Sequence, residues 1–427
     1  HPVNYQQDVA PWLGQKAGFF FTSLSENAQK GAAVIETTNP TAALAFARKA
    51  SGATETSPAP QTYNGASYQT EPDDQTTAFG TVGDFLVIGS VDGFKAAVDA
   101  EQGDSLGDDD DFKDALGKLP SDRLGTFFTV PRTLFNAIGS AQFGQQQQAL
   151  LEKSAGESLD QPVSGALTAS ADSFHLEFIG GDNGVETPES SLVGNVPADS
   201  WLALGLGNLG DTAKRTIDQL KDAGIPDLQL GLSQIEQATG SSIDQLTSAL
   251  GDAAVYVRGT TEKSLNGALI VQTNNPDLTG RLLGQLQSLM QAGSTGTTSV
   301  KPLSLSGGGN GFQISDPTEV PQPIEFAQQG DKLVIGYGAG SVQQSLAPSQ
   351  TLTDSPTFST AKGQLSDLGT DLFVDLPKVF KLAESAGAKS DPGYLQAKPY
   401  IDALSYLVTG TGSEGDQTKL EAVVGLK

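Results

Sequence analysis

The feature that most constrains this chain is an internal repeat with a period of about 240 residues. Five short motifs occur twice in the same order, and the offset drifts only from 236 (Ala33 to Leu269) to 247 (Gly83 to Gly330). The first members are residues 12–14, 33–40, 83–89, 128–131 and 176–177, and the second members are 249–251, 269–276, 330–336, 374–377 and 420–421. This collinearity predicts a duplicated domain, with copy one at residues 1–190 and copy two at 191–427.

Each copy shows strand patterns that alternate with short helix patterns. Asn39-Pro40 and Asn275-Pro276 predict helix starts, because Asn caps free N–H groups and Pro suits the first helical position. Residues 165–170 and 173–179 alternate as a hairpin does, with Phe174 facing the core and His175 facing water. Half-polar strands suit antiparallel sheets. We therefore expect an α+β fold of two tandem copies, each a mostly antiparallel sheet with helices on one face.

The two copies begin differently. About 50 residues of copy two, residues 196–248, precede its Ala249-Leu250-Gly251 motif, whereas only residues 1–11 precede Trp12 in copy one. Copy one is therefore predicted to lack the N-terminal strand and at least one helix that copy two contains. An open strand position exposes unpaired backbone groups and attracts another strand. Three states remain open: an empty slot, a slot filled by a cleaved fragment, or one filled by another chain. We assign the interaction edge to Val3, Tyr5 and Trp12.

Charge and composition exclude several classes of function. The chain has 25 Lys and Arg against 50 Asp and Glu, a net charge of -25, no Cys and two His. The absence of Cys excludes disulfides, thiolate metal sites and Cys nucleophiles. An acidic surface repels phosphate backbones, so no nucleic-acid partner is expected, and no cofactor is expected either. The sequence contains no apolar run long enough to span a membrane.

Two motifs invite a functional interpretation that their context weakens. Gly205, Gly207 and Gly210 match a dinucleotide-binding pattern, but a chain this rich in glycine produces such a match by chance, and no acidic strand end follows. The run Asp108, Asp109, Asp110 and Asp111 is a weak calcium candidate, but carboxylates at a helix start also cap N–H groups. No catalytic residue is assigned, although the many acidic residues keep a hydrolase with paired carboxylates open.

Several motifs resemble the bacterial domain-of-unknown-function family numbered 3352. They are residues 8–14, the Asn39-Pro40 helix start, Tyr63-Asn64-Gly65, residues 85–89 and residues 105–112, in this order. The family has no assigned activity and occurs largely in actinobacteria, behind a signal or membrane segment. The resemblance implies a location outside the cytoplasmic membrane, extracellular or at the cell surface or envelope. The chain departs from the family at its start, so a membrane tether is expected only through an N-terminal segment beyond residue 1.

These observations favour a non-enzymatic structural or interaction module of the cell envelope. Its expected partner is a second copy of the chain, self-assembling through the open sheet edge, or another envelope protein. The alternative is an extracytoplasmic binding protein that holds an apolar or amphipathic ligand between sheet and helices.

Overall fold

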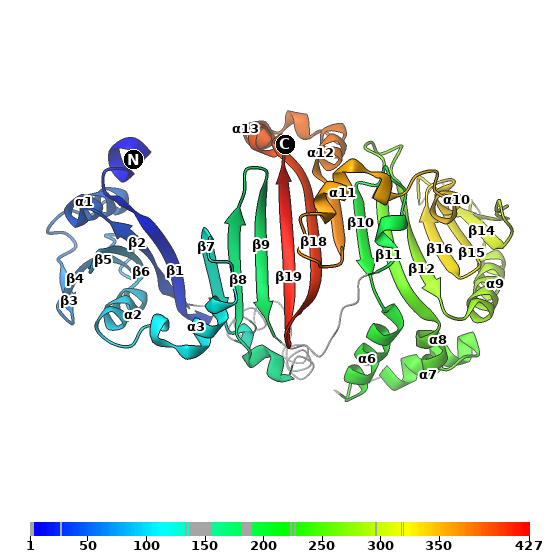
Figure 1. Ribbon diagram of the computed structural model, residues 1–427, viewed down its shortest axis with the longest axis horizontal. Coiled ribbons are helices and arrows are strands. Elements are labelled where there is room, and N and C mark those ends of the chain that lie inside the picture. The colour runs from blue at the N-terminus through cyan, green and yellow to red at the C-terminus, as the bar shows by residue number, and fades with distance from the viewer. Residues whose placement is uncertain are drawn as a thin grey trace. The chain divides into compact units, whose positions relative to one another are not determined.

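The fold is described from a computed structural model (Figure 1). The structure describes residues 4–25, 28–132, 135, 156–181, 190–222, 224–225, 228–294, 297–316, 318 and 320–427. It divides into two compact units, which are described separately. Unit 1 contains residues 1–118, 128–152 and 159–163, and unit 2 contains residues 119–127, 153–158 and 164–427.

Unit 1 is built on a six-stranded antiparallel sheet in the order β1-β2-β6-β5-β4-β3. Its strands are β1 (Leu13–Ser25), β2 (Ala28–Thr37), β3 (Gln61–Tyr63), β4 (Ala66–Thr70), β5 (Thr77–Val82) and β6 (Phe85–Ser90). Its helices are α1 (Pro40–Ser51), α2 (Val91–Gln102) and α3 (Asp110–Gly117), with the short turns η1 (Tyr5–Val9) and η2 (Leu106–Asp108).

Helices cover both faces of this sheet, which corrects the expectation of one covered face. Leu86 and Val87 follow each other on β6, so their side chains point to opposite faces. Leu86 packs in a cluster with Ala43 and Ala47 of α1, and Val87 packs in another with Phe94 and Val98 of α2. A strand that is buried on both faces consists of consecutive apolar residues. The apolar run of β6 was therefore the sequence signal for helices on both faces of this sheet.

Unit 2 is built on a thirteen-stranded antiparallel sheet in the order β13-β14-β15-β16-β12-β11-β10-β17-β18-β19-β9-β8-β7. Its strands are β7 (Gly125–Thr129), β8 (Val163–Ala169), β9 (Ser173–Gly180), β10 (Leu202–Leu206), β11 (Leu250–Arg258), β12 (Asn266–Thr273), β13 (Ser299–Pro302), β14 (Asn310–Ser315), β15 (Ile324–Gln329), β16 (Lys332–Tyr337), β17 (Leu372–Asp375), β18 (Leu404–Glu414) and β19 (Gln417–Leu426).

Eight described α-helices belong to unit 2, together with short turns. They are α6 (Leu209–Asp222), α7 (Leu228–Thr239), α8 (Ile243–Ser248), α9 (Pro276–Gly293), α10 (Ser341–Leu346), α11 (Pro356–Lys362), α12 (Leu376–Ser385) and α13 (Pro392–Ile401), with the turns η3 (Gly156–Asp160), η4 (Val193–Asn195), η5 (Leu352–Asp354) and η6 (Ala388–Ser390). The α+β class and the antiparallel pairing are as the sequence predicts.

The two copies share one strand register. Gly18 pairs with Val34, which pairs with Val87, and in copy two Ala254 pairs with Ile270, which pairs with Val334. Asn39 and Asn275 cap α1 and α9 as predicted, each accepting a hydrogen bond from a backbone N–H three residues later. The structure therefore contains the duplicated plan that the repeated motifs indicate.

The compact units do not coincide with the copies. β9 of copy one pairs with β19 of copy two along its length, from Thr418 opposite Gly180 to Gly425 opposite Ser173, and the two strands lie side by side in Figure 1. The boundary near residue 190 expected from composition is therefore not the point at which the compact units divide. Backbone hydrogen bonds, rather than the order of the copies, decide which strands fold together.

The faces of β9 are opposite to those expected. Phe174 and Leu176 are exposed, and His175, Glu177 and Ile179 point to the more buried side. The imidazole Nε2 of His175 lies 2.9 Å from the hydroxyl of Ser173. An alternating pattern fixes which residues share a face, but not which face is covered.

Candidate functional site

A large apolar hollow lies in unit 1. It has a volume of about 660 Å³ and lies between the sheet face formed by β1, β2 and β6 and the helical segment from α2 to η2. We call it the unit 1 groove and define it by residues that share an apolar or small side chain: Gly18, Phe20, Val34, Val87, Ala97 and Leu106.

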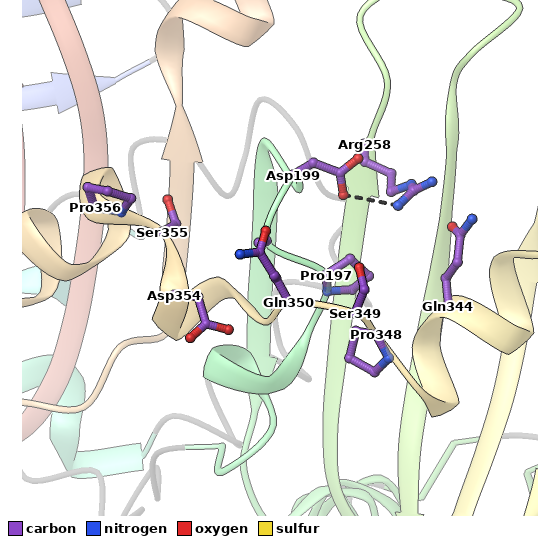
Figure 2. Close-up of a pocket in the computed structure, with 11 residues that line it drawn as sticks. Pro197, Asp199, Arg258, Gln344, Pro348, Ser349, Gln350, Asp354, Ser355 and Pro356 are labelled. Atoms are coloured by element: carbon purple, nitrogen blue, oxygen red, sulfur yellow. Dashed lines mark hydrogen bonds and ion pairs between the residues drawn. The ribbon is translucent and has the colours of Figure 1, made fainter.

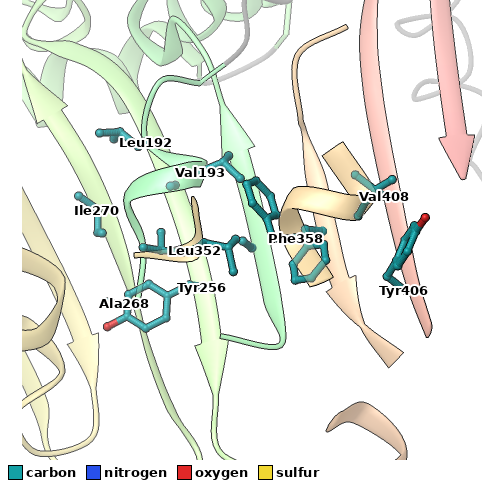
Figure 3. Close-up of a cluster of buried hydrophobic side chains, with 14 of the residues drawn as sticks. Leu192, Val193, Tyr256, Ala268, Ile270, Leu352, Phe358, Tyr406 and Val408 are labelled. Carbon is teal, nitrogen blue, oxygen red and sulfur yellow. The ribbon is translucent and has the colours of Figure 1, made fainter. Parts of the chain in front are cut away.

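The same positions form a closed core in copy two. The register equates Gly18, Phe20, Val34 and Val87 with Ala254, Tyr256, Ile270 and Val334. All four copy-two residues are buried in one cluster, drawn in part in Figure 3. The corresponding unit 1 positions differ in exposure, because Gly18 is exposed and Phe20 only half-buried.

The turns after α2 and α10 provide the sharpest contrast. η2 and η5 both carry a capping box, Ser105 with Asp108 and Thr351 with Asp354, so Leu106 and Leu352 occupy equivalent positions. Leu106 is 53 % exposed, whereas Leu352 is 0 % exposed. One side chain lines an open groove, and the other lies inside a core.

A segment of copy two that has no counterpart among the described residues of copy one closes this core. Leu192 and Val193 pack in the cluster with Tyr256 and Leu352 (Figure 3). Val196, and Ala203 of β10, belong to the same cluster. The carbonyl of Val196 accepts a 2.8 Å hydrogen bond from the N–H of Leu352, and β10 pairs with β11. We call residues 192–206 the insert segment.

A carboxylate fixes both ends of the insert segment. Asp252 accepts hydrogen bonds from the N–H and hydroxyl of Ser191, at 2.9 and 2.8 Å, and from the N–H of Asn208, at 3.1 Å. Burial raises the pKa of Asp252, but these three hydrogen bonds outweigh it and hold the pKa below its ordinary value. The corresponding stretch of β1 carries Gln15 and Lys16 instead.

β1 has one neighbour in its sheet, whereas its counterpart β11 has two. In copy two β10 separates β11 from β17; among the described strands of copy one, β1 pairs only with β2 and β7 only with β8. Two aromatic side chains mark the open edge of β1, because Phe19 is 75 % and Phe21 50 % exposed. Both aromatic side chains and the unpaired edge are features of a strand that accepts a partner.

A second, more polar hollow lies in unit 2 (Figure 2). It has a volume of about 440 Å³, and the insert segment contributes Pro197, Ala198 and Asp199 to its lining. Asp199 is paired with Arg258 at 3.0 Å, and Asp354 is engaged in its capping box. The charged side chains of the described lining are therefore already engaged with partners.

Of the residues assigned to the interaction edge, Trp12 is buried and Tyr5 is exposed. Trp12 is 2 % exposed and packs in the α1 cluster, with its indole N–H donating to the carbonyl of Asp8 at 2.7 Å. It is therefore a core residue, which corrects its assignment to the edge. Tyr5 is exposed on η1, and Val3 lies outside the described residues.

The acidic run caps helix starts. Asp108 accepts hydrogen bonds from the N–H and hydroxyl of Ser105, which lower its pKa, and Asp109 caps α3 through the N–H of Phe112. Asp110 pairs with Lys113 at 3.3 Å. Over the described part of the chain, no three acidic or His side chains gather where a metal ion would fit, so the calcium candidate receives no support.

The glycine motif follows β10 for structural reasons. A side chain at Gly210 would meet the carbonyl oxygen of Thr247 at 2.3 Å, and Asn208 has a positive φ of 48°. On β19, Lys419 lies 3.1 Å from Glu421 and 3.5 Å from Glu177, so these two carboxylates share one ion-pair partner.

The residues of the unit 1 groove were not singled out by motif reasoning. The signal for them is the run Phe19-Phe20-Phe21, which stands where copy two has Val255-Tyr256-Val257 next to β10. A comparison of the copies position by position would have found an aromatic strand without its neighbour. The groove offers apolar contact and a strand edge, and Glu101 is the one charged residue in its lining.

The comparisons with known proteins agree with the resemblance. No curated protein and no solved structure matches the chain. In the described parts, no helix has the length and apolar character needed to cross a membrane. The sequence model of the family described as "Protein of unknown function (DUF3352)" matches residues 1–426. The chain belongs to this family.

Proposed function

We propose that the chain is a non-enzymatic interaction module of the cell envelope or cell surface that binds a partner in the unit 1 groove and along the outer edge of β1. The observation that carries this proposal is the contrast between Leu106, which is 53 % exposed, and Leu352, which is 0 % exposed. An apolar surface that is covered in one copy and open in the other is typical of a docking site.

A location outside the cytoplasmic membrane is supported by the absence of Cys and by the family resemblance. Fractionation of the source organism with an antibody against the chain tests it. Recovery in the envelope or medium supports the proposal, and recovery mainly in the cytosol contradicts it.

Self-assembly is the simplest form of this interaction. A second copy that added a strand to β1 through a different surface of its own would make a head-to-tail contact, which propagates into rings or filaments. Light scattering of the full chain across a concentration series measures this directly. Phe19→Asp with Phe21→Asp should reduce the mass of any assembly, and Leu289→Asp, at a 73 % exposed leucine of α9 in unit 2, is the matched control.

A second candidate function is the binding of an apolar or amphipathic small ligand. The groove volume of about 660 Å³ lies within the range of about 300–1,000 Å³ typical of ligand sites. Fluorescence titration with an apolar dye tests this candidate. Leu106→Trp would fill the groove and abolish saturable dye binding, whereas an unchanged titration would place the dye elsewhere.

A further inference from the structure

The core of copy two indicates which kind of segment fits the unit 1 groove. Copy two contains the same groove with an occupant in place, so that occupant shows what fits. Resting on the proposed docking function, we infer that the unit 1 groove binds a β-strand segment of a partner protein, with the apolar character of the insert segment, residues 192–206.

The register of copy two sets the alignment of this strand. Ala203 of β10 lies opposite Tyr256, and Leu202 and Leu204 lie opposite Val257 and Val255. Carried over to copy one, the partner strand runs antiparallel to β1. A small residue faces Phe20, and large apolar residues lie beside Phe21 and Phe19.

Both faces of the open edge require an apolar strand. Phe20 points to the α2 face, where its cluster includes Val34 and Val87, whereas Phe19 and Phe21 point to the α1 face and are exposed. A strand that alternates apolar and polar residues would cover one face only. The residues of β10, Leu-Ala-Leu-Gly-Leu, are apolar throughout and satisfy both faces.

The groove beyond the strand edge requires an apolar turn ahead of the strand. In copy two Leu192, Val193 and Val196 precede β10 and cover Leu352, whose N–H donates to the carbonyl of Val196. Leu106 presents the equivalent side chain to the open groove. The partner is therefore a polypeptide in which two or three aliphatic residues precede a short apolar strand, rather than an isolated strand.

The test uses the full chain and a synthetic, fluorescently labelled peptide of residues 190–208. Fluorescence anisotropy measures binding, and hydrogen exchange with and without peptide locates it. We expect saturable binding with new protection in β1 and η2. Leu106→Asp should weaken binding about 10- to 100-fold, the loss expected for one buried leucine, whereas the matched control Leu289→Asp should bind as the unchanged chain does.

The peptide itself provides a test of register. Replacement of Ala203 by Trp in the peptide places a large ring opposite Phe20 and should abolish binding, whereas Trp at the position of Asn208, outside the strand, should not. Circular dichroism of the Leu106→Asp chain confirms folding, and its exposed position makes folding of this variant the expected result.

The outcomes separate this inference from the proposed function. Binding that protects other strands, or that Leu106→Asp leaves unchanged, overturns the inference. Absence of peptide binding together with Leu106-dependent self-association also overturns it and retains the docking function with a second copy as occupant. Absence of peptide binding, self-association and saturable dye binding overturns both.

Discussion

The two copies differ most in the burial of residues that occupy the same register positions. Val34 and Ile270 occupy the same register position in the same sheet plan, yet Ile270 lies in a closed cluster and Val34 lines a groove. The difference arises from one segment, residues 192–206, which covers copy two and has no described counterpart in copy one. We propose that the groove left uncovered among the described residues of unit 1 is a docking site.

The largest effect should come from truncating the two equivalent leucines. Leu352→Ala removes a fully buried side chain and should lower the local free energy of unfolding by about 2–5 kcal/mol. Leu106→Ala, at the half-exposed counterpart, should cost less than about 1 kcal/mol. Hydrogen exchange resolves the two units separately, and equal losses would contradict the comparison.

Asp252 should provide the next largest effect, because it holds both ends of the insert segment. Asp252→Asn weakens three hydrogen bonds to a carboxylate and should cost about 1–3 kcal/mol locally. Asp277→Asn, at an exposed carboxylate that begins α9, is the control. Hydrogen exchange of β10 measures the loss, and unchanged protection of β10 would show that Asp252 does not hold the segment.

The same carboxylate predicts a pH dependence. The pKa of Asp252 is lower in the folded chain than its ordinary value of 3.8, so its stabilising contribution is complete above that ordinary value and is lost as the pH falls through the lower folded pKa. Protection of the insert segment should therefore fall under these acidic conditions and should vary less in Asp252→Asn.

A smaller effect on stability should follow from removing the hydroxyl of Tyr256 or adding one to the equivalent Phe20. The hydroxyl of Tyr256 lies 2.9 Å from that of Ser345 inside the core, so Tyr256→Phe should cost about 1 kcal/mol. Phe20→Tyr adds a hydroxyl to an open groove and should be nearly neutral. Hydrogen exchange and thermal melting measure the change in the free energy of unfolding of each variant. A large loss of stability from Phe20→Tyr would indicate that the groove is already filled.

The smallest effect on stability should come from the exposed edge. Phe19→Ser and Phe21→Ser should change the free energy of unfolding by no more than about 0.5 kcal/mol, because the side chains are at least half exposed. The same variants should reduce association with a partner. A large destabilisation would show that these rings are packed in the free chain.

Local features of the fold were predictable from the sequence because their causes are local. The Asn-Pro helix starts and the hairpin of β8 and β9 are set by capping and turn chemistry within a few residues. The covered face of β9 was not predictable, because alternation leaves the two faces equivalent until a distant element packs on one of them. The pairing of β9 with β19 joins residues that are far apart in sequence, and no local pattern encodes it.

The candidate site was predictable in part. The unequal lengths ahead of Trp12 and Ala249 pointed to the outer edge of β1, and the position of β10 at the centre of its sheet explains why this edge matters. The assignment of Trp12 to the edge was wrong, because this apolar residue just before β1 packs in the α1 cluster. The burial of Trp12 depends on its packing against α1 in the folded chain and not on its neighbours in sequence.

The most direct test of the open strand position is hydrogen exchange of β1 and β11 in the full chain, on material shown to be monomeric by light scattering. Amides of β11 hydrogen bond to strands on both sides, and those of β1 on one side only. The account predicts that alternate amides of residues 17–21 exchange rapidly, while their counterparts at residues 253–257 remain protected. Equal protection of both strands in the monomer would contradict it.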